Sequence, residues 1–258
     1  MSFARYVAIG DSSTEGLDDP DGAGHYRGWA DRLAAHVAGA QPEPLLYANL
    51  AVRGLKTREI LDQQLASALA MRPDLATVFT GTNDLIRRQV DLTAVAGDIQ
   101  KMQQAFRDIG ATVVTFTMPD LAEIIPGAAR LRPRLEAFNA GVRASCAATG
   151  TLLVDLAHHR VAGDPRLWSE DRLHANTLGH TRIAQGLAHA LGLEGFDESW
   201  AKPLPPRTRA SVGARVSTEI RWTRRYLLPW LVRRVTGASS GDGILPKRPT
   251  LTLVTPAA

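Results

Sequence analysis

Ser12 carries a hydroxyl group that could act as a nucleophile, and it stands in Gly10-Asp11-Ser12, directly after the apolar run 6–9. In open α/β folds the carboxyl ends of the strands form the edge at which chemistry takes place. A serine hydroxyl attacks a carbonyl group only when a general base removes its proton and a further group orients that base. The sequence therefore predicts a nucleophile at Ser12 and requires two partners elsewhere.

Asp171 and His174 are the candidate partners, because they stand three residues apart just before the expected last helix. On a loop, this spacing can place the carboxylate against Nδ1 of the imidazole and leave Nε2 free to face Ser12. Six other histidines compete with His174 for the role of base. His180, inside the expected helix, is interpreted as a packing or capping residue.

A tetrahedral intermediate also needs hydrogen-bond donors for its negatively charged oxygen. Three groups at expected strand ends can supply them: the backbone amide of Ser12, the backbone amide of Gly54 and the side-chain amide of Asn83. Glycine suits a position at which the backbone must approach a ligand closely. Each of these residues could equally serve as a simple cap or turn residue, as Ser12 could at the start of a helix.

Together these residues form four blocks that resemble the SGNH hydrolase family (GDSL esterases and lipases), and the stretches 28–31 and 168–170 resemble its bacterial intracellular members. The blocks are Gly-Asp-Ser with Gly16 four residues beyond Ser12, Asn-x-Ala-x-x-Gly ending at Gly54, Gly-Thr-Asn-Asp at 81–84, and Asp-x-x-His at 171–174. The resemblance covers about residues 4–192. One departure is Ala51, where many relatives carry glycine.

The resemblance implies a flavodoxin-like sandwich with strand order 2-1-3-4-5 and hydrolysis through an acyl-enzyme. It assigns Ser12, His174 and Asp171 to a catalytic triad, and Ser12, Gly54 and Asn83 to an oxyanion hole. It also selects Ser12 over the adjacent Ser13 as the nucleophile. No metal and no organic cofactor are expected, and Asp84 is expected to anchor its loop.

The elements that must position these residues alternate along residues 1–195. Continuous apolar runs are typical of strands buried on both faces, and segments with helical spacing separate them. This alternation predicts an α/β fold, a three-layer α/β/α sandwich with a five-stranded parallel sheet. The expected strands are 5–9, 45–50, 75–80, 112–117 and 152–156, and the last helix is expected at 178–191.

Residues 196–258 differ from this body and are predicted to be a separate, basic C-terminal extension, partly helical and partly loop. Residues 203–206 are interpreted as a linker. Residues 212–235 keep near-helical spacing, and Pro229 is expected to kink or end that helix. Residues 251–254 are expected to be an edge strand or disordered. Residues 201–258 contain eleven Lys and Arg against two acids, a net charge of +9, which leaves −5 for residues 1–200.

Three interpretations of this extension stay open. Its apolar face could pack on the body, with its arginines paired to the acids there. Alternatively, the interleaved arginines and aromatic residues of 212–235 could contact a membrane surface. Binding to a nucleic-acid backbone is the least favoured interpretation.

Several other features have plain structural explanations. The acid-rich loop 18–22 is interpreted as a solvated turn, because it lacks the full ligand pattern of a calcium loop. His158 and His159 have no carboxylate or cysteine partners at ligand spacing, so no metal site is predicted there. Cys146 is expected to be a buried, inert thiol.

The sequence thus predicts a serine hydrolase that cleaves carboxylic esters, either small-molecule or lipid. The alternatives are an acyltransferase that uses the same acyl-enzyme, and a membrane-docking binding protein with a vestigial hydrolase body. No secretory signal or membrane span is recognised, so a cytoplasmic location is expected. Specificity is expected to lie in the loops 17–27, 85–91 and 118–132, the last of which carries apolar residues suited to an acyl chain.

Overall fold

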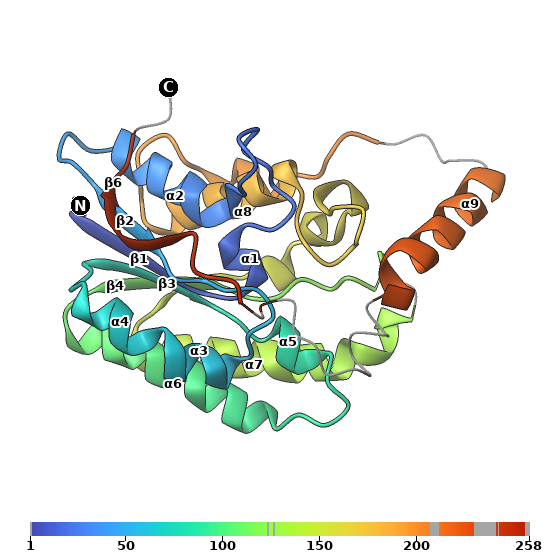
Figure 1. The fold of residues 1–258 in the computed structure, drawn as a ribbon, viewed down its shortest axis with the longest axis horizontal. Helices are drawn as coiled ribbons and strands as arrows, with labels where there is room; N and C mark the ends of the chain where they lie inside the picture. Colours follow the sequence, from blue (N-terminus) through green and yellow to red (C-terminus); the bar gives the residue numbers. More distant parts are fainter. Residues whose placement is uncertain are drawn as a thin grey trace.

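A central sheet of six strands organises the protein (Figure 1). The computed structural model describes residues 2–122, 124–125, 127–206, 212–229, 241 and 243–255. The sheet order is β5-β4-β3-β1-β2-β6, and its first five strands are mutually parallel. These strands are β1 (Arg5–Gly10), β2 (Leu46–Asn49), β3 (Leu75–Phe79), β4 (Thr112–Phe116) and β5 (Leu152–Val154). The expected order 2-1-3-4-5 is confirmed.

The sixth strand, β6 (Arg248–Leu253), differs from the prediction of five strands. It comes from the basic extension and pairs antiparallel with β2, with Leu46 opposite Leu253. The expected strand at 251–254 is therefore present but begins three residues earlier. Because an edge strand presents unpaired backbone groups, β6 covers groups of β2 that would otherwise be open. The division into residues 1–195 and 196–258 stays a prediction.

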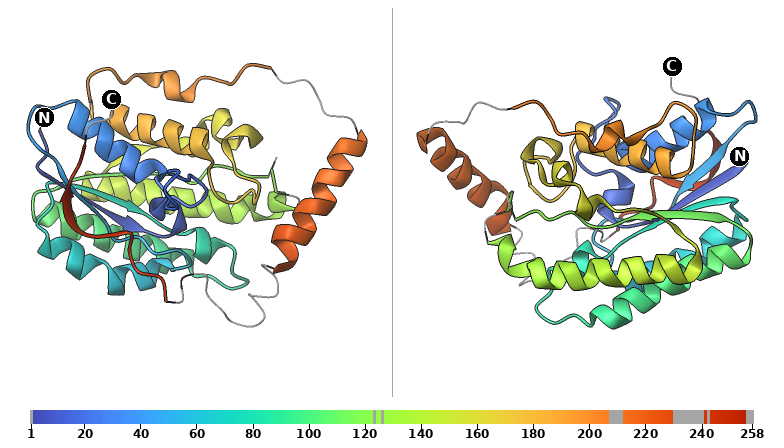
Figure 2. Two further views of the ribbon diagram at one scale, coloured as in Figure 1. Left: turned by 45° about the horizontal axis from the view of Figure 1, so that its top comes forward. Right: turned by 180° about the vertical axis from the view of Figure 1, so that it is seen from behind.

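Helices cover both faces of the sheet, as the alternating pattern predicts (Figures 1 and 2). One face carries α2 (Gly28–Gly39) and α8 (Thr177–Ala190), which pack on each other. The opposite face carries α3 (Thr57–Gln63), α4 (Leu65–Ala70), α6 (Leu92–Asp108) and α7 (Arg132–Thr149). All five residues of β3 are buried, which explains why four of them are apolar; the fifth, Thr77, bonds the Tyr6 hydroxyl.

Short elements follow the carboxyl ends of the parallel strands and build the site. The one-turn helices α1 (Ser12–Glu15) and α5 (Thr82–Leu85) follow β1 and β3. Three 3₁₀ segments follow β5: η2 (Leu156–His158), η3 (Arg160–Gly163) and η4 (Pro165–Leu167). Two more, η1 (Ala128–Leu131) and η5 (Glu198–Ala201), precede α7 and follow α8.

The helix α9 (Val212–Trp222) and the π-helical segment η6 (Thr223–Leu227) lie at one end of the molecule, apart from the stacked layers (Figures 1 and 2). They form part of the helical segment expected at 212–235, of which residues 230–235 lie outside the described residues. Among the described helices, none is both long and apolar enough to cross a bilayer.

Candidate active site

Ser12 is the first residue of α1, directly beyond β1, at the carboxyl edge of the sheet. The end of β1 is held by Gln64, whose side-chain amide accepts from Gly10 N and donates to Gly10 O, both at 2.9 Å. A side chain at Gly10 would be impossible, because its Cβ would lie 2.2 Å from Thr14 Oγ1 and 2.5 Å from Phe79 O. The first glycine of the motif is therefore required by packing.

Asp11, and not Ser12, caps the helix α1. Its side chain accepts a hydrogen bond from Ser13 N at 3.1 Å. The interpretation of Ser12 as an N-cap is therefore wrong, and its hydroxyl is left available for other partners. The hydroxyl of Ser13 accepts from Trp29 Nε1 at 3.3 Å.

The structure brings Ser12, His174 and Asp171 into one hydrogen-bonded chain. Ser12 Oγ lies 2.8 Å from Nε2 of His174, and Nδ1 of the same imidazole lies 2.6 Å from Asp171 Oδ2. This is the order in which a hydroxyl, a general base and an orienting carboxylate must stand. Ser12 belongs to α1, whereas Asp171 and His174 belong to the turn that precedes α8. Ser12 and His174 are 162 residues apart in the sequence.

The turn from Asp171 to His174 also orients the carboxylate through its own backbone. Asp171 Oδ1 accepts from the amides of Leu173 and His174 at 2.9 and 3.0 Å and lies 2.6 Å from Ser169 Oγ. Burial opposes ionisation of Asp171, but these donors and His174 outweigh it and lower its pKa to about 2. The carboxylate is thus ionised at neutral pH.

His174 experiences two opposing influences. Burial disfavours the imidazolium form, but the hydrogen bond to Asp171 and the negative charge of that carboxylate favour it more strongly. The pKa of His174 is therefore raised above its ordinary value. A raised pKa strengthens the imidazole as a proton acceptor for a hydroxyl.

The proposed oxyanion donors lie on neighbouring loops. Gly54 adopts a φ of +81°, in the left-handed region that favours glycine. Nδ2 of Asn83 donates to Leu55 O at 3.0 Å, beside Gly54, and lies 3.4 Å from Asp11 Oδ2, beside Ser12. An amide nitrogen carries two hydrogens, and both have acceptors here, so an incoming oxygen would replace the longer bond to Asp11.

Sequence reasoning missed the ion pair that holds the Gly54 loop. Glu15, the last residue of α1, is buried and accepts from Arg53 N at 2.9 Å as well as pairing with the Arg53 guanidinium. Asn49 adds a second link, because its side chain donates to Thr14 O at 2.8 Å and accepts from Ala51 N at 3.0 Å. The glutamate could have been noticed as an acid following the motif, but its partner is 38 residues away.

Asp11 is the other buried carboxyl group of the site. Burial raises its pKa to about 7, although the Ser13 amide acts in the opposite direction. Its Oδ2 faces Asn83 at 3.4 Å. Asp84 anchors its loop as expected, since its Oδ2 accepts from both the amide and the hydroxyl of Thr57 at 2.9 and 2.8 Å.

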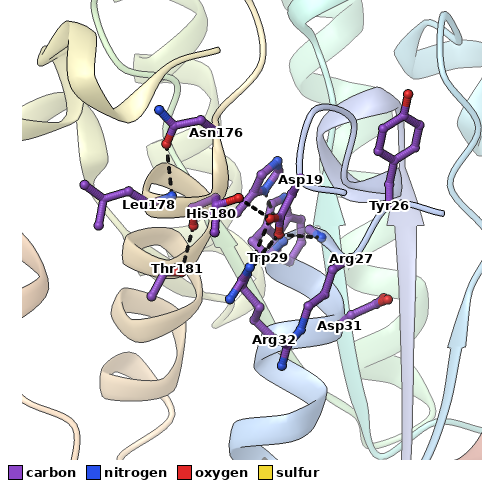
Figure 3. Close-up of polar contacts among 12 residues, drawn as sticks. Asp19, Tyr26, Arg27, Trp29, Asp31, Arg32, Asn176, Leu178, His180 and Thr181 are labelled. Atoms are coloured by element: carbon purple, nitrogen blue, oxygen red, sulfur yellow. Dashed lines mark hydrogen bonds and ion pairs between the residues drawn. The ribbon is translucent and has the colours of Figure 1, made fainter. Parts of the chain in front are cut away.

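A polar network joins the loop between α1 and α2 to the helices α2 and α8 (Figure 3). His180 is fully buried, accepts from Trp29 N at 3.1 Å and bonds Leu17 O at 3.0 Å through Nε2. Burial lowers its pKa to about 4, so it stays neutral and structural, as predicted. Asp19 is also buried and pairs with Arg32, which corrects the interpretation of 18–22 as a wholly solvated turn.

One group of three potential metal ligands occurs among the described residues, and it overlaps the site. Ligand atoms of Asp18, Asp171 and His174 lie within 4.8 Å of one another. Asp171 and His174 are bonded to each other at 2.6 Å, and Asp18 Oδ2 lies 2.6 Å from Ser169 Oγ. The three residues therefore already have partners within the triad and its supporting turn.

An apolar pocket opens beside Ser12 and His174 and encloses about 60 Å³. The expected loop 118–132 contributes to its wall, whereas the loops 17–27 and 85–91 do not. Trp200, from η5, is buried and lies against it, although it belongs to the part of the chain after the expected hydrolase body. The apolar lining of the pocket includes Phe79, Phe116, Met118, Leu121, Leu156, Val161, Ala162, Leu167, Ile183 and Trp200.

The fold and the site together define a class, that of hydrolases in which a serine and a His–Asp pair meet at the carboxyl edge of a parallel sheet. The model of the GDSL-like lipase/acylhydrolase family matches residues 8–182, and the chain belongs to this family. The match ends before η5 and α9, so the family description does not include Trp200 or the basic extension.

Solved structures share this fold at low sequence identity. LAE5, an alpha/beta hydrolase enzyme from the metagenome of Lake Arreo in Spain, is 23% identical, with a TM-score of 0.62 over 74% of this chain and 96% of its own. TesA is 21% identical, with a TM-score of 0.60 over 72% and 97%. Axe2, an acetylxylan esterase from Geobacillus stearothermophilus, is 17% identical, with a TM-score of 0.62 over 79% and 98%. A search of curated proteins found no significant match.

Proposed function

We propose that this protein hydrolyses carboxylic esters through an acyl-enzyme formed on Ser12. The observation that carries the proposal is the chain of hydrogen bonds from Ser12 Oγ to His174 Nε2 and from His174 Nδ1 to Asp171. His174 takes the hydroxyl proton as Ser12 Oγ attacks the ester carbonyl, and Asp171 stabilises the imidazolium that forms. His174 then gives the proton to the departing alkoxide.

Deacylation repeats these steps with water in place of Ser12. Water gives a proton to His174 and attacks the acyl carbonyl, and the proton returns to Ser12 Oγ as the acid leaves. In both halves the negative oxygen would lie against the amides of Ser12 and Gly54 and the side chain of Asn83. The left-handed turn at Gly54 and the place of the Asn83 amide, which donates to Leu55 O and to Asp11 Oδ2 beside Ser12, support this assignment.

The pocket beside Ser12 supports a short acyl group. Its volume of about 60 Å³ is well below the cavity of about 150 Å³ that takes up a benzene ring in a protein core. An apolar wall suits the hydrocarbon part of an acyl chain, and the small volume favours two to four carbons over a long chain. Axe2 is named as an acetylxylan esterase, which agrees with a small acyl group.

Exchange of Ser12 for alanine tests the proposed nucleophile. We expect the S12A variant to lose both the turnover of p-nitrophenyl acetate and covalent labelling by a fluorophosphonate. An unaltered melting temperature would show that the variant is folded. Retained turnover in the folded variant would contradict the assignment, and absence of both activities from the wild-type protein would contradict the proposed function.

Acyl transfer is the second candidate, because an alcohol could replace water during deacylation. Product analysis with added alcohols separates the two reactions: ester products in preference to the free acid would indicate a transferase. The remaining alternative, a binding protein with a vestigial hydrolase body, is less favoured, because the nucleophile, base and acid lie at hydrogen-bonding distances.

A further inference from the structure

The helix α9 contacts the rest of the protein at the turn that contains Asp171, the carboxylate of the proposed triad. It lies at the end of the molecule, beyond the layers around the sheet (Figure 2). Side chains of α9 contact Asp171 and Arg172, and a side chain of η6, which follows α9 directly, contacts Glu170. The family model ends at residue 182, so this contact belongs to the extension of this chain.

Arg172, which stands between Asp171 and His174 in the sequence, makes the strongest of these contacts. Arg172 donates from Nη2 and Nη1 to the two carboxylate oxygens of Glu219, at 2.7 and 2.8 Å. Its guanidinium also lies over the ring of Trp222, 4.6 Å from the centroid. A paired fork of hydrogen bonds combined with stacking fixes the direction of an arginine side chain.

Trp222 adds a direct contact with the catalytic acid residue. Its side chain is 8% exposed, and Nε1 donates to the backbone carbonyl of Asp171 at 3.1 Å. One helical turn later, the hydroxyl of Tyr226 donates to Glu170 at 3.0 Å. The inward face of α9 and η6 thus holds three consecutive residues, Glu170, Asp171 and Arg172.

The backbone of this turn needs such support. Arg172 has a φ of +66°, a conformation that residues other than glycine adopt only at a cost. The same conformation lets the amides of Leu173 and His174 reach Asp171 Oδ1. If Arg172 relaxed, the Asp171 carboxylate would lose the geometry with which it orients the imidazole.

We propose that α9 is a positioning element for the catalytic turn, in which Glu219 and Trp222 hold Arg172 and the backbone of Asp171. The proposal rests on the proposed function, because Asp171 and His174 are its acid and base. Glu219 and Trp222 are positioning residues and take no part in bond making. Their removal lowers the rate of the chemical step while the acyl pocket, formed by other residues, keeps its shape.

The test compares Glu219→Gln and Trp222→Ala with Arg221→Gln, a control that removes a charge from an exposed position on the same helix. We expect kcat for p-nitrophenyl acetate to fall tenfold to a hundredfold, roughly the effect of a small displacement of a catalytic group. We expect KM and the ratio of acetyl to butyryl turnover to stay unchanged. The control should keep the wild-type kcat.

A second readout needs no turnover. NMR titration of His174 should give a pKa closer to the ordinary histidine value in Glu219→Gln and Trp222→Ala than in the wild type, because a misaligned Asp171 stabilises the imidazolium less. Wild-type kcat and an unchanged His174 titration in both variants would overturn the proposal, as would equal effects in Arg221→Gln. An inactive wild-type protein would contradict the proposed function alone, since the titration would still report on positioning.

Discussion

Asp11 and Asp171 lie in the same site, yet their surroundings move their pKa values in opposite directions. Asp171 receives two backbone amides and the imidazole of His174, and its pKa falls to about 2. Asp11 is fully buried, and burial raises its pKa to about 7. Donor number and desolvation therefore keep Asp171 fully ionised at neutral pH and Asp11 only partly ionised. Two predictions follow from this difference at the level of single residues.

The pH profile of kcat/KM reports on the pair of His174 and Asp171. Activity needs neutral His174, so a raised pKa places the acidic limb above the ordinary value of about 6.5. In Asp171→Asn this limb should move to lower pH, and kcat should fall by about three to four orders of magnitude. Esterase rates from pH 5 to 9 check both effects, with the exposed Asp62→Asn as the control. An unshifted limb would contradict the role of Asp171.

The pH dependence of stability reports on Asp11. Its folded pKa is raised, so the unfolded chain ionises first, and the free energy of unfolding falls as pH rises from about 4 towards 7. The Asp11→Asn variant should lose this dependence. The difference in free energy of unfolding between the variant and the wild type should therefore shift in favour of the variant by about a few kcal/mol between pH 4 and pH 7. Urea unfolding at several pH values measures the difference. Equal pH dependence in both proteins, with Asp62→Asn as the exposed control, would argue against a buried neutral carboxyl group.

At the level of elements, the site is assembled from strand ends that are joined by buried side chains. Glu15 ties α1 to the loop that carries Gly54, and Gln64 ties the end of β1 to the gap between α3 and α4. Each link joins segments that are distant in sequence. The positions of the proposed oxyanion donors Ser12 and Gly54 therefore depend on packing between elements. Two predictions belong to this scale.

Replacement of Glu15 by glutamine should disturb the loop that presents the Gly54 amide. The variant keeps the shape of the side chain but removes the charge that pairs with Arg53. Because loss of one oxyanion donor costs about 10²–10³ in kcat, partial displacement should cost about tenfold, with little change in KM. Steady-state kinetics check this expectation. Glu59→Gln, which breaks a more exposed ion pair with Lys56, should leave kcat unchanged.

Enlargement of Ala162 in η3 tests the acyl pocket. Ala162 is buried and lines the pocket, so Ala162→Leu should fill part of its roughly 60 Å³. We expect turnover of butyryl esters to fall at least tenfold relative to acetyl esters, at a cost of about 1–3 kcal/mol in stability. A series of p-nitrophenyl esters measures the ratio, in which acetyl turnover is the internal control. An unchanged ratio would place the acyl chain elsewhere.

At the scale of the whole molecule, the described part of the basic extension contacts the acidic body at several places, of which Trp200 beside the pocket is one. Lys247 donates to the carbonyls of Tyr26 and Arg27 at 2.9 and 2.7 Å and pairs with Asp31 at 3.0 Å. The adjacent strand β6 extends the sheet, and α9 contacts the catalytic turn at the other end. These contacts agree with packing of the extension on the body. Membrane contact through 212–235 stays a separate prediction.

Exposed side chains of α9 and η6 are the basis of that prediction. Val216 and Ile220 are half exposed, and Arg221 and Arg224 are exposed beside them. Such a combination suits the interface of an anionic bilayer. The full chain should float with vesicles containing phosphatidylserine and dissociate at high salt, and the double variant Arg221→Gln/Arg224→Gln should bind more weakly. Equal binding to neutral vesicles, or no binding at all, would contradict the prediction.

The sequence by itself predicted the parallel sheet and the residues proposed for the chemistry, and its resemblance to a known family supplied the strand order. Strands buried on both faces and short motifs at their ends leave patterns that are local in sequence, and the four blocks around Ser12, Gly54, Asn83 and His174 are of this kind. Only the tertiary structure decided that Glu15 pairs with Arg53, that Asp11 is a buried carboxyl group with a raised pKa, that Trp200 borders the pocket and that α9 contacts the backbone of Asp171. These features depend on contacts between distant segments and on desolvation, and neither leaves a pattern in the local sequence.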